Sequence, residues 1–448
     1  MTVLALALAT VRHRPAGAIG SSTAVAFGAA MLGLCAVLFA SALTRRRSAD
    51  PTAADDYVGA IAVFATQAAI AVFATVFVVA ATTALSITHR RRDLALLRNA
   101  GATPGQVRRL VTLEAVLTAT PAAVLGTAVG AVLADSLARV FARSPEIPDG
   151  FAVRQHPLPL VISAAVLVVV AYLAASAAGR RAGRLSPAEA LTRAETGRYR
   201  IGIVRGLLGV LCLAGAVALL LVAATTTDDP GLGVGYAFMD SALALVAVGL
   251  LAPVLLRPVA ALVGVLGRLT TTGRLAVADI AADPQRTAAS AVPTALLVTL
   301  NASMVQTSLV AADRGEQGTQ TWSLTLLAAT TIGFTAIALV NSTAMTVAQR
   351  RAQYTDLRLA GATRGQVRAT AGWEALLSTA TGAVAGATIS VLAAAAFAIS
   401  LQLPPTDVLR PALLLALAGG GIGLALATST IVSGRVTRDP DLLAATDQ

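Results

Sequence analysis

The sequence predicts an all-α polytopic membrane protein with about ten transmembrane helices, arranged as two parallel four-helix units joined by two linking helices. Of its 448 residues, 56% are hydrophobic and only 13% are charged, whereas a soluble domain has about 25% charged residues. The apolar residues fall in long blocks that meet the length of about 20 residues needed to cross a bilayer. A short segment between two such blocks also occurs twice in nearly the same form. A membrane protein with an internal duplication fits these observations.

Ten apolar blocks are candidate spans. They cover residues 19–43, 57–87, 110–141, 158–179, 203–224, 238–266, 288–311, 322–349, 368–400 and 411–433. The second block continues without interruption into His89 and three arginines, so we expect its helix to project beyond the bilayer. Residues 3–9 are apolar and precede Arg12 and Arg14, the reverse of the order in a cleavable signal peptide. This order favours a short interfacial helix before the first span.

Arginine is concentrated on one predicted side of the membrane, in the loops 88–109, 180–205 and 350–368. Acids prevail on the other side, in the loops 225–237, 312–321 and 401–410. The positive-inside rule therefore places both termini in the cytoplasm of a multi-pass protein of the cell (plasma or inner) membrane. Arg45–Arg47 fall on the outer side, where Asp50, Asp55 and Asp56 offset them. No outer loop, including the longest at 142–157, is long enough to form a domain of its own.

The composition excludes several function classes. The net charge of +11 comes from arginine, because the chain has no lysine. A P-loop ATPase needs a lysine against the phosphates, so this chain does not carry that activity itself. We expect no nucleic-acid partner, since the arginines lie in short loops between spans. The isolated histidines and the span-embedded Cys35 and Cys212 predict no metal site and no catalytic residues.

A twelve-residue segment is repeated between the spans. Residues 97–108 read Leu-Arg-Asn-Ala-Gly-Ala-Thr-Pro-Gly-Gln-Val-Arg, and residues 357–368 differ from them only at Leu359 and Arg364. In the same register Arg90 and Arg91 match Arg350 and Arg351, Glu114 matches Glu374, and Gly126 matches Gly386. The copies follow the second and eighth spans, so they share one orientation. The predicted units are therefore residues 1–200 and 271–448, joined by linking helices within 201–270.

The repeated segment predicts a short helix, a tight turn and a second helix. Gly101 suits the left-handed end of a helix, and Thr103 can N-cap the next helix with Gln106 at its third position. Pro104 suits the first helical position, and Arg364 replaces it in the second copy. The alternative is a connection that merely turns the chain. The recurrence in two matched loops favours a function, because a simple turn tolerates many sequences.

A few residues inside the spans are further candidates. Glu114 and Glu374 lie about one turn into their spans, where a charge is costly and often functional. The interpretation we favour is an interfacial acid paired with Arg108 or Arg109, or with Arg368. Asp135 and Asp240 fall near predicted outer ends, where we expect solvated side chains. Gly126-x-x-x-Gly130 and Gly419–Gly421 favour close helix packing.

These segments resemble the FtsX-like permease family of ABC transporters, which includes macrolide exporters, lipoprotein-releasing permeases and bacitracin-resistance permeases. The resemblance rests on Arg92-Asp93-Leu94, on Leu97-Arg98 through Val107, on Leu357-Arg358 through Val367, and on Leu185-Ser186-Pro187-Ala188-Glu189-Ala190-Leu191. It implies two fused FtsX-like units that cover most of the chain.

The resemblance further implies that each repeated loop is a coupling helix in a groove of a separate ATPase. One ATPase subunit would contact Asp93, Leu97, Arg98, Gly101, Ala102, Thr103, Gln106 and Val107. The other would contact Leu357, Arg358, Gly361, Ala362, Thr363, Gln366 and Val367. Gln353 stands where the first copy has Asp93, so the acidic contact would be asymmetric. The partner is then a cytoplasmic ABC ATPase in two copies; ATP and Mg²⁺ bind there, and this chain binds no cofactor.

The absence of a long outer loop departs from many relatives, which pass motion to a periplasmic partner through a large extracytoplasmic domain. Export or extraction of a hydrophobic or lipid-like substrate or antibiotic becomes the leading hypothesis. The alternatives are a non-transporting ABC-type regulator of an envelope protein and a secondary transporter driven by an ion gradient.

Overall fold

The computed structural model describes residues 15–48, 50, 54–89, 91–141, 147–148, 151–184, 202–226, 230–282, 284–313, 320–348 and 350–436. Within these ranges all regular structure is helical. The predicted interfacial helix at residues 3–9, the segment 185–191 and Arg90 lie outside the described residues.

The chain divides into two compact units. One comprises Met1–Arg198 with Glu316–Phe334, and the other comprises Tyr199–Gly315 with Thr335–Gln448. Helix α13 (Gln320–Ala348) therefore contributes its first half to the first unit and its second half to the second. The division of the sequence at residues 200 and 270, which was drawn from the repeat, stays a prediction.

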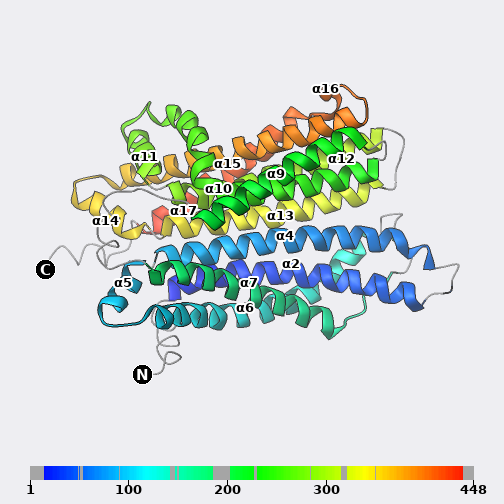
Figure 1. The fold of residues 1–448 in the computed structure, drawn as a ribbon, viewed down its shortest axis with the longest axis horizontal. Coiled ribbons are helices and arrows are strands. Elements are labelled where there is room, and N and C mark those ends of the chain that lie inside the picture. Colours follow the sequence, from blue (N-terminus) through cyan, green and yellow to red (C-terminus); the bar gives the residue numbers. More distant parts are fainter. Residues whose placement is uncertain are drawn as a thin grey trace. The chain divides into compact units, whose positions relative to one another are not determined.

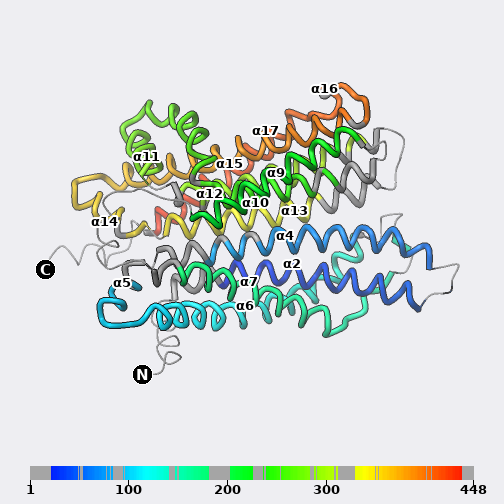
Figure 2. Tube along the Cα trace, viewed as in Figure 1, coloured from blue at the N-terminus to red at the C-terminus, as the bar shows by residue number. Residues whose placement is uncertain are grey.

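The first unit is built from four long helices that run side by side (Figures 1 and 2). They are α2 (Pro15–Ser48), α4 (Tyr57–His89), α6 (Pro104–Phe141) and α7 (Pro157–Arg184). Helix α2 packs against α4, α6 and α7, and the short α5 (Arg91–Asn99) joins α4 to α6. At 1.5 Å per residue, α4 and α6 are each about 50 Å or longer, so they extend beyond a hydrocarbon core of about 30 Å.

The second unit contains helices that match those of the first, preceded by three others. Its helices are α9 (Ile203–Thr226), α10 (Pro230–Gly267), α11 (Thr271–Ala282), α12 (Pro284–Asp313), α14 (Arg351–Leu359), α15 (Arg364–Ser400), α16 (Pro405–Val408) and α17 (Pro411–Val436), with the second half of α13. Helix α12 packs against α15 as α2 packs against α6, and α15 packs against α17 as α6 packs against α7. Helices α9 and α10 pack on each other, and α10 also packs on α12 and α15.

Eight of the described helices are long and apolar enough to cross a membrane, and α10 supplies a ninth if its two arms are counted as one span. The predicted all-α polytopic class is confirmed, and the count of ten stays a prediction. Helix α12, over the predicted span 288–311, is not among the nine. It buries polar side chains, which lower its hydropathy: Thr294, Thr299, Asn301, Ser303 and Gln306.

Helix α10, over the span predicted at 238–266, is not straight. It bends by 82° between Met239–Ala252 and Val254–Gly267. The break falls at Pro253, which lacks the N–H that a continuous helix needs and clashes with the preceding turn. The arm after the break therefore departs from the direction of the arm before it.

Asp240 is not solvated, as the sequence had suggested, but buried, with only 2% of its surface exposed. Helix α10 begins at Pro230, ten residues before Asp240, and its first arm packs on α9 and α12. Asp240 therefore lies inside the packed part of the helix rather than at its end. Its carboxylate oxygens have no hydrogen-bond partner among the described residues. Asp135 is exposed, as expected.

Glycines bring the paired helices into backbone contact in both units. A Cβ atom at Gly126 or Gly130 of α6 would overlap the carbonyl oxygen of Ala26 or Ala30 of α2. In α15, a Cβ atom at Gly382 would overlap the carbonyl oxygen of Ala291, and one at Gly386 would lie 2.8 Å from that of Ala295. The predicted role of Gly126 and Gly130 in close packing is confirmed. Of Gly419–Gly421, only Gly421 lies near other helices: a Cβ atom there would be 2.9 Å from Leu297 Cδ2.

We expect Gly126→Ala and Gly382→Ala to destabilise the detergent-solubilised protein by about 1–3 kcal/mol each, because the added methyl group forces the paired helices apart. Thermal unfolding followed by size-exclusion fluorescence measures the effect. Gly420→Ala is the matched control, since nothing lies within 4 Å of its Cβ position. If Gly126→Ala were as stable as Gly420→Ala, the close packing would be wrong.

Candidate functional site

Each unit carries one helix–turn–helix element at the end of its long helices. We call residues 91–107 the first bracket and residues 351–367 the second bracket. The first consists of α5, a turn and the start of α6, and the second consists of α14, a turn and the start of α15. In the second unit, α14 and α16 lie at opposite ends (Figure 1).

The turn of each bracket is closed by a left-handed glycine. Gly101 has φ +93° and Gly361 has φ +92°, in the region where a side chain would be strained. In the first bracket the Gly101 N–H donates to the Arg98 carbonyl and the Ala102 N–H donates to the Leu97 carbonyl, each at 3.0 Å. The second bracket repeats both bonds at 3.0 and 2.9 Å. This pattern is the Schellman motif, which satisfies the last carbonyls of the short helix.

The following helix begins with a capping box in both copies. The Thr103 N–H donates to Gln106 Oε1 at 2.8 Å, and the Gln106 N–H donates to Thr103 Oγ1 at 3.3 Å. Thr363 and Gln366 make the same pair of bonds at 2.8 and 3.2 Å. The replacement of Pro104 by Arg364 leaves this cap intact, as the sequence had suggested.

A small apolar core holds each bracket against the helix bundle. In the first, Leu94 and Val107 are buried with Val111 of α6 and Ala175 of α7, and Leu97 and Ala102 pack beside them. In the second, the equivalent core contains Tyr354, Val367, Ala371 and Val347, with Leu357, Ala362 and Val432 beside them. The short helix is therefore fixed to its unit on one side and open on the other.

The structure places the predicted contact residues on two sides of each bracket. The exposed ones are Gly101, Thr103, Gln106, Arg358, Gly361, Thr363 and Gln366. The half-buried ones are Leu97, Arg98, Ala102, Leu357 and Ala362. Val107 and Val367 are buried, so they support the bracket from inside. Asp93 lies in α5, with its side chain outside the described set. Gln353 is exposed.

Two apolar residues on the open side were missed by the sequence analysis. Leu96 is 59% exposed in the first bracket, and Leu359 is 63% exposed in the second. Leu96 stands outside the stripe formed by Leu94 and Leu97, three residues apart, and that spacing is the signal that could have identified it. Each adds one exposed apolar side chain to the open side of its bracket.

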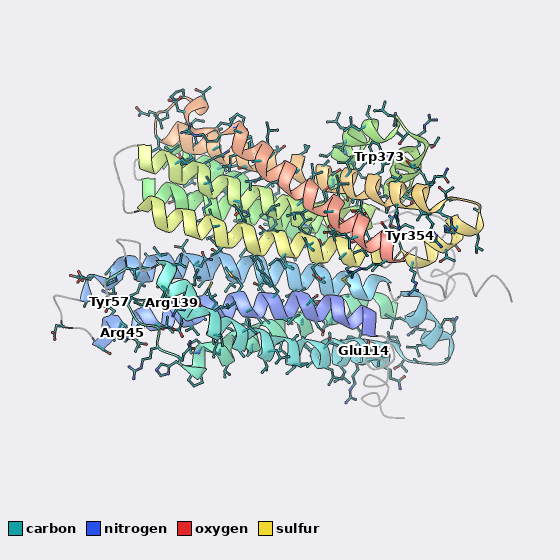
Figure 3. The ribbon with its side chains drawn as sticks, turned by 180° about the vertical axis from the view of Figure 1, so that it is seen from behind. Arg45, Tyr57, Glu114, Arg139, Tyr354 and Trp373 are labelled. Carbon is teal, nitrogen blue, oxygen red and sulfur yellow. The ribbon has the colours of Figure 1, made fainter. Side chains whose placement is uncertain are left out.

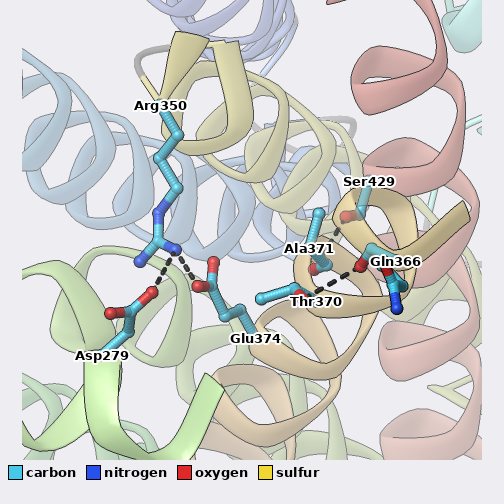
Figure 4. A network of polar contacts seen from close by, with 7 residues as sticks. All are labelled: Asp279, Arg350, Gln366, Thr370, Ala371, Glu374 and Ser429. Atoms are coloured by element: carbon cyan, nitrogen blue, oxygen red, sulfur yellow. Dashed lines mark hydrogen bonds and ion pairs between the residues drawn. The ribbon is translucent and has the colours of Figure 1, made fainter. Parts of the chain in front are cut away.

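Three charged residues fix the second bracket to its unit (Figure 4). Arg350, which is 5% exposed, stands between α13 and α14. Its guanidinium forms ion pairs with Glu374 of α15 and, at 3.5 Å, with Asp279 of α11. They line a small cavity of about 30 Å³. One residue thus joins the bracket, α11 and the long helix α15.

The prediction that Glu374 pairs with Arg368 is wrong, because Arg350 occupies the space beside Glu374. The Arg368 guanidinium instead points to α17, where its Nη2 lies 3.6 Å from the Cβ position of Gly434. Glu114, labelled in Figure 3, is likewise buried in α6. Its pairing with Arg108 or Arg109 stays a prediction.

The duplicated brackets agree with a comparison to protein families. The model of the FtsX-like permease C-terminal family matches residues 65–187 and 325–440, together more than half of the chain, and each match contains one bracket. The chain belongs to the FtsX-like permease family. No curated protein matches it in sequence. Permeases of this family are transport subunits of ABC transporters and generally work with a cytoplasmic ABC ATPase. The predicted family and its duplication in this chain are confirmed.

The turn of each bracket in this FtsX-like permease should depend on glycine. Gly101→Ala and Gly361→Ala are each expected to cost about 1–2 kcal/mol through the left-handed conformation, and asparagine should cost less. Faster hydrogen exchange at the amides of residues 100–102 and 360–362 would report the loss. Gly105→Ala and Gly365→Ala, in the following helix with open space around them, are the controls. If these amides exchanged at the same rate in the Gly101 and Gly361 variants as in the Gly105 and Gly365 controls, the turn geometry would be contradicted.

The Arg350 network should be intolerant of losing one partner. Arg350→Met leaves Glu374 buried without its cation and is expected to destabilise the protein by about 3–5 kcal/mol. Replacing both, Arg350→Met with Glu374→Leu, should cost less than Arg350→Met alone. Thermal unfolding measures both variants, with Arg351→Met at the exposed neighbouring position as control. If the stability lost in the double variant equalled the sum of the losses in Arg350→Met and Glu374→Leu, the pairing would be refuted.

Proposed function

We propose that this FtsX-like permease couples ATP hydrolysis by two copies of a cytoplasmic ABC ATPase to the export or extraction of a hydrophobic or lipid-like substrate. The observation that carries the proposal is the pair of brackets, which share the Schellman turn, the capping box and an open face. One ATPase subunit would dock on each bracket. Because the chain has no lysine, it lacks the P-loop residue that binds ATP phosphates and depends on such a partner.

The contact in this proposal is made by the open face of each bracket. The exposed members of the predicted set, together with Leu96 and Leu359, would enter the ATPase groove. The two faces are unequal, since Leu96 is matched by Asp356 and Leu359 by Asn99 in the repeat register. The buried Val107 and Val367 would keep the face rigid rather than touch the partner.

The long helices offer a route for the motion. Each bracket continues without a break into α6 (38 residues) or α15 (37 residues), and each of these helices is longer than the membrane core is thick. A displacement of the bracket by the ATPase would therefore move the far end of the same helix. In the second unit, Arg350 would transmit it to α11 as well.

The proposed substrate class is supported by the far side of the first unit. In the described part of the connection after α6, Ile147 and Phe151 lie in the core formed with α2 and α4. The Arg154 N–H donates to Ser41 Oγ at 3.0 Å. A short, packed connection suits work on a molecule within the bilayer better than work on a periplasmic partner. The arginine-rich loops and both termini would lie in the cytoplasm of a cell-membrane protein.

The docking assignment is tested by Leu96→Glu combined with Leu359→Glu, which changes exposed positions and leaves the bracket cores intact. We expect co-purification of a co-expressed cytoplasmic ABC ATPase that binds the unchanged permease to fall by about tenfold or more, as for contact residues worth 2 kcal/mol. The control is Asp407→Arg in α16, an exposed position at the other end of the second unit. Unchanged association and ATPase stimulation would show that the brackets are not the docking sites.

A transport assay in vesicles distinguishes an exporter from a regulator. ATP-driven movement of a fluorescent lipophile that is lost in the Leu96→Glu, Leu359→Glu variant supports the exporter. ATPase stimulation by the permease without movement of any tested lipophile would instead indicate a non-transporting regulator.

A further inference from the structure

The second arm of α10 and the helix α11 form a hairpin beside α15. A Cβ atom at Gly267 would lie 3.1 Å from the carbonyl oxygen of Gly273, so the two helices nearly touch at the turn. Val263 and Ala276 of the hairpin are buried against Leu377 of α15, with Trp373 packed beside them. Figure 3 shows Trp373 at this place. The hairpin is thus a fixed part of the second unit.

The first arm of α10 is long enough by itself to cross a bilayer core. The first arm of α10, from Pro230 to Ala252, extends about 34 Å at 1.5 Å per residue, which exceeds a hydrocarbon core of about 30 Å. After the 82° bend the second arm runs in a different direction from the first. The ion pair between Asp279 of α11 and Arg350 places this hairpin at the same end as the second bracket.

The outer side of the second arm is apolar. Leu262 is 71% exposed and Leu269 is 77% exposed, and Val265 and Leu266 are also exposed. Such a side is stable against acyl chains rather than against water.

A groove of about 290 Å³ runs along this hairpin. It is lined mainly by apolar residues of α10, α11 and α15, among them Leu256, Ala260, Ala261, Val277, Ile280 and Leu377. At about 30 Å³ for each water of liquid volume, the groove has room for roughly ten small groups, as in a segment of an acyl chain. An apolar groove of this size suits an amphiphile.

The charged groups in the groove all have one sign. Arg257 and Arg268 line it, and no acid is among its lining residues. They are three helical turns apart, about 16 Å along the arm. Thr287 also lines the groove, and its buried hydroxyl has no hydrogen-bond partner within the described part of the chain. Cations and an unused hydroxyl in the lining of an apolar groove are complementary to an anionic headgroup on an acyl chain.

We propose that this groove binds an anionic phospholipid. The phosphate contacts Arg257 or Arg268, and an acyl chain covers the apolar residues between α10 and α11. The site is separate from the ATPase contact and does not require the proposed transport activity. Because Ile280 and Thr287 also line the cavity beside Arg350, a bound lipid lies next to the residues that hold the second bracket.

The test uses the full-length permease, purified in detergent without an ATPase, and native mass spectrometry of bound dioctanoyl phosphatidylglycerol. Arg257→Gln with Arg268→Gln is expected to weaken binding about tenfold to thirtyfold, from roughly 1 kcal/mol per arginine near an anionic headgroup. Ala261→Trp, which fills the groove and keeps both arginines, should also weaken binding. Arg364→Gln, an exposed arginine of α15 outside the groove lining, should stay within about twofold of the unchanged protein.

Three results would overturn the proposal. Dioctanoyl phosphatidylcholine that bound as tightly as phosphatidylglycerol would remove the role of the anionic headgroup. Inorganic phosphate that bound with the affinity of the lipid would make this a site for a free anion. Equal loss of lipid in the Arg364→Gln control would mean that the surface charge of the second unit, rather than the groove, attracts lipid.

Discussion

Backbone contact between two long helices determines where everything else in each unit lies. Helix α6 lies against α2 at Gly126 and Gly130, and α15 lies against α12 at Gly382 and Gly386. In a membrane the hydrophobic effect does not drive helices together, so close packing of small residues supplies the attraction. Helices α6 and α15 also start in the brackets. The position of each bracket is therefore set by a glycine contact well inside the helix bundle.

Several short-range bonds hold the bracket in one conformation. A nine-residue helix is too short to be stable alone in water. The Schellman turn, the capping box and four buried apolar residues together keep it folded, and they do so in both copies. In the second copy a buried ion pair adds a tertiary anchor at the junction with α13. A rigid element with one open face is suited to receiving force from a partner.

The sequence predicted the bracket well because its geometry is local. Gly101, Thr103 and Gln106 act on atoms within a few residues, so their types and spacing were sufficient. Features that depend on distant helices were missed or misassigned: the partner of Glu374 comes from another helix, Asp240 is buried by neighbours of α10, and the exposure of Leu96 depends on how α5 packs. The bend of α10 is local, but Pro253 stands within an unbroken apolar block that was counted as one straight span.

The polar side of α12 has a consequence for biogenesis. The Thr299 hydroxyl donates to the Gly386 carbonyl at 3.2 Å, and Ser303 Oγ donates to Ser390 Oγ at 3.3 Å. These partners lie 87 residues later in the chain, so the ribosome makes α12 well before it makes them. Until α15 is made, α12 lacks these two bonds to it, and an unsatisfied polar group is costly in a lipid environment. The polar side of α12 is therefore completed only when α15 packs on it.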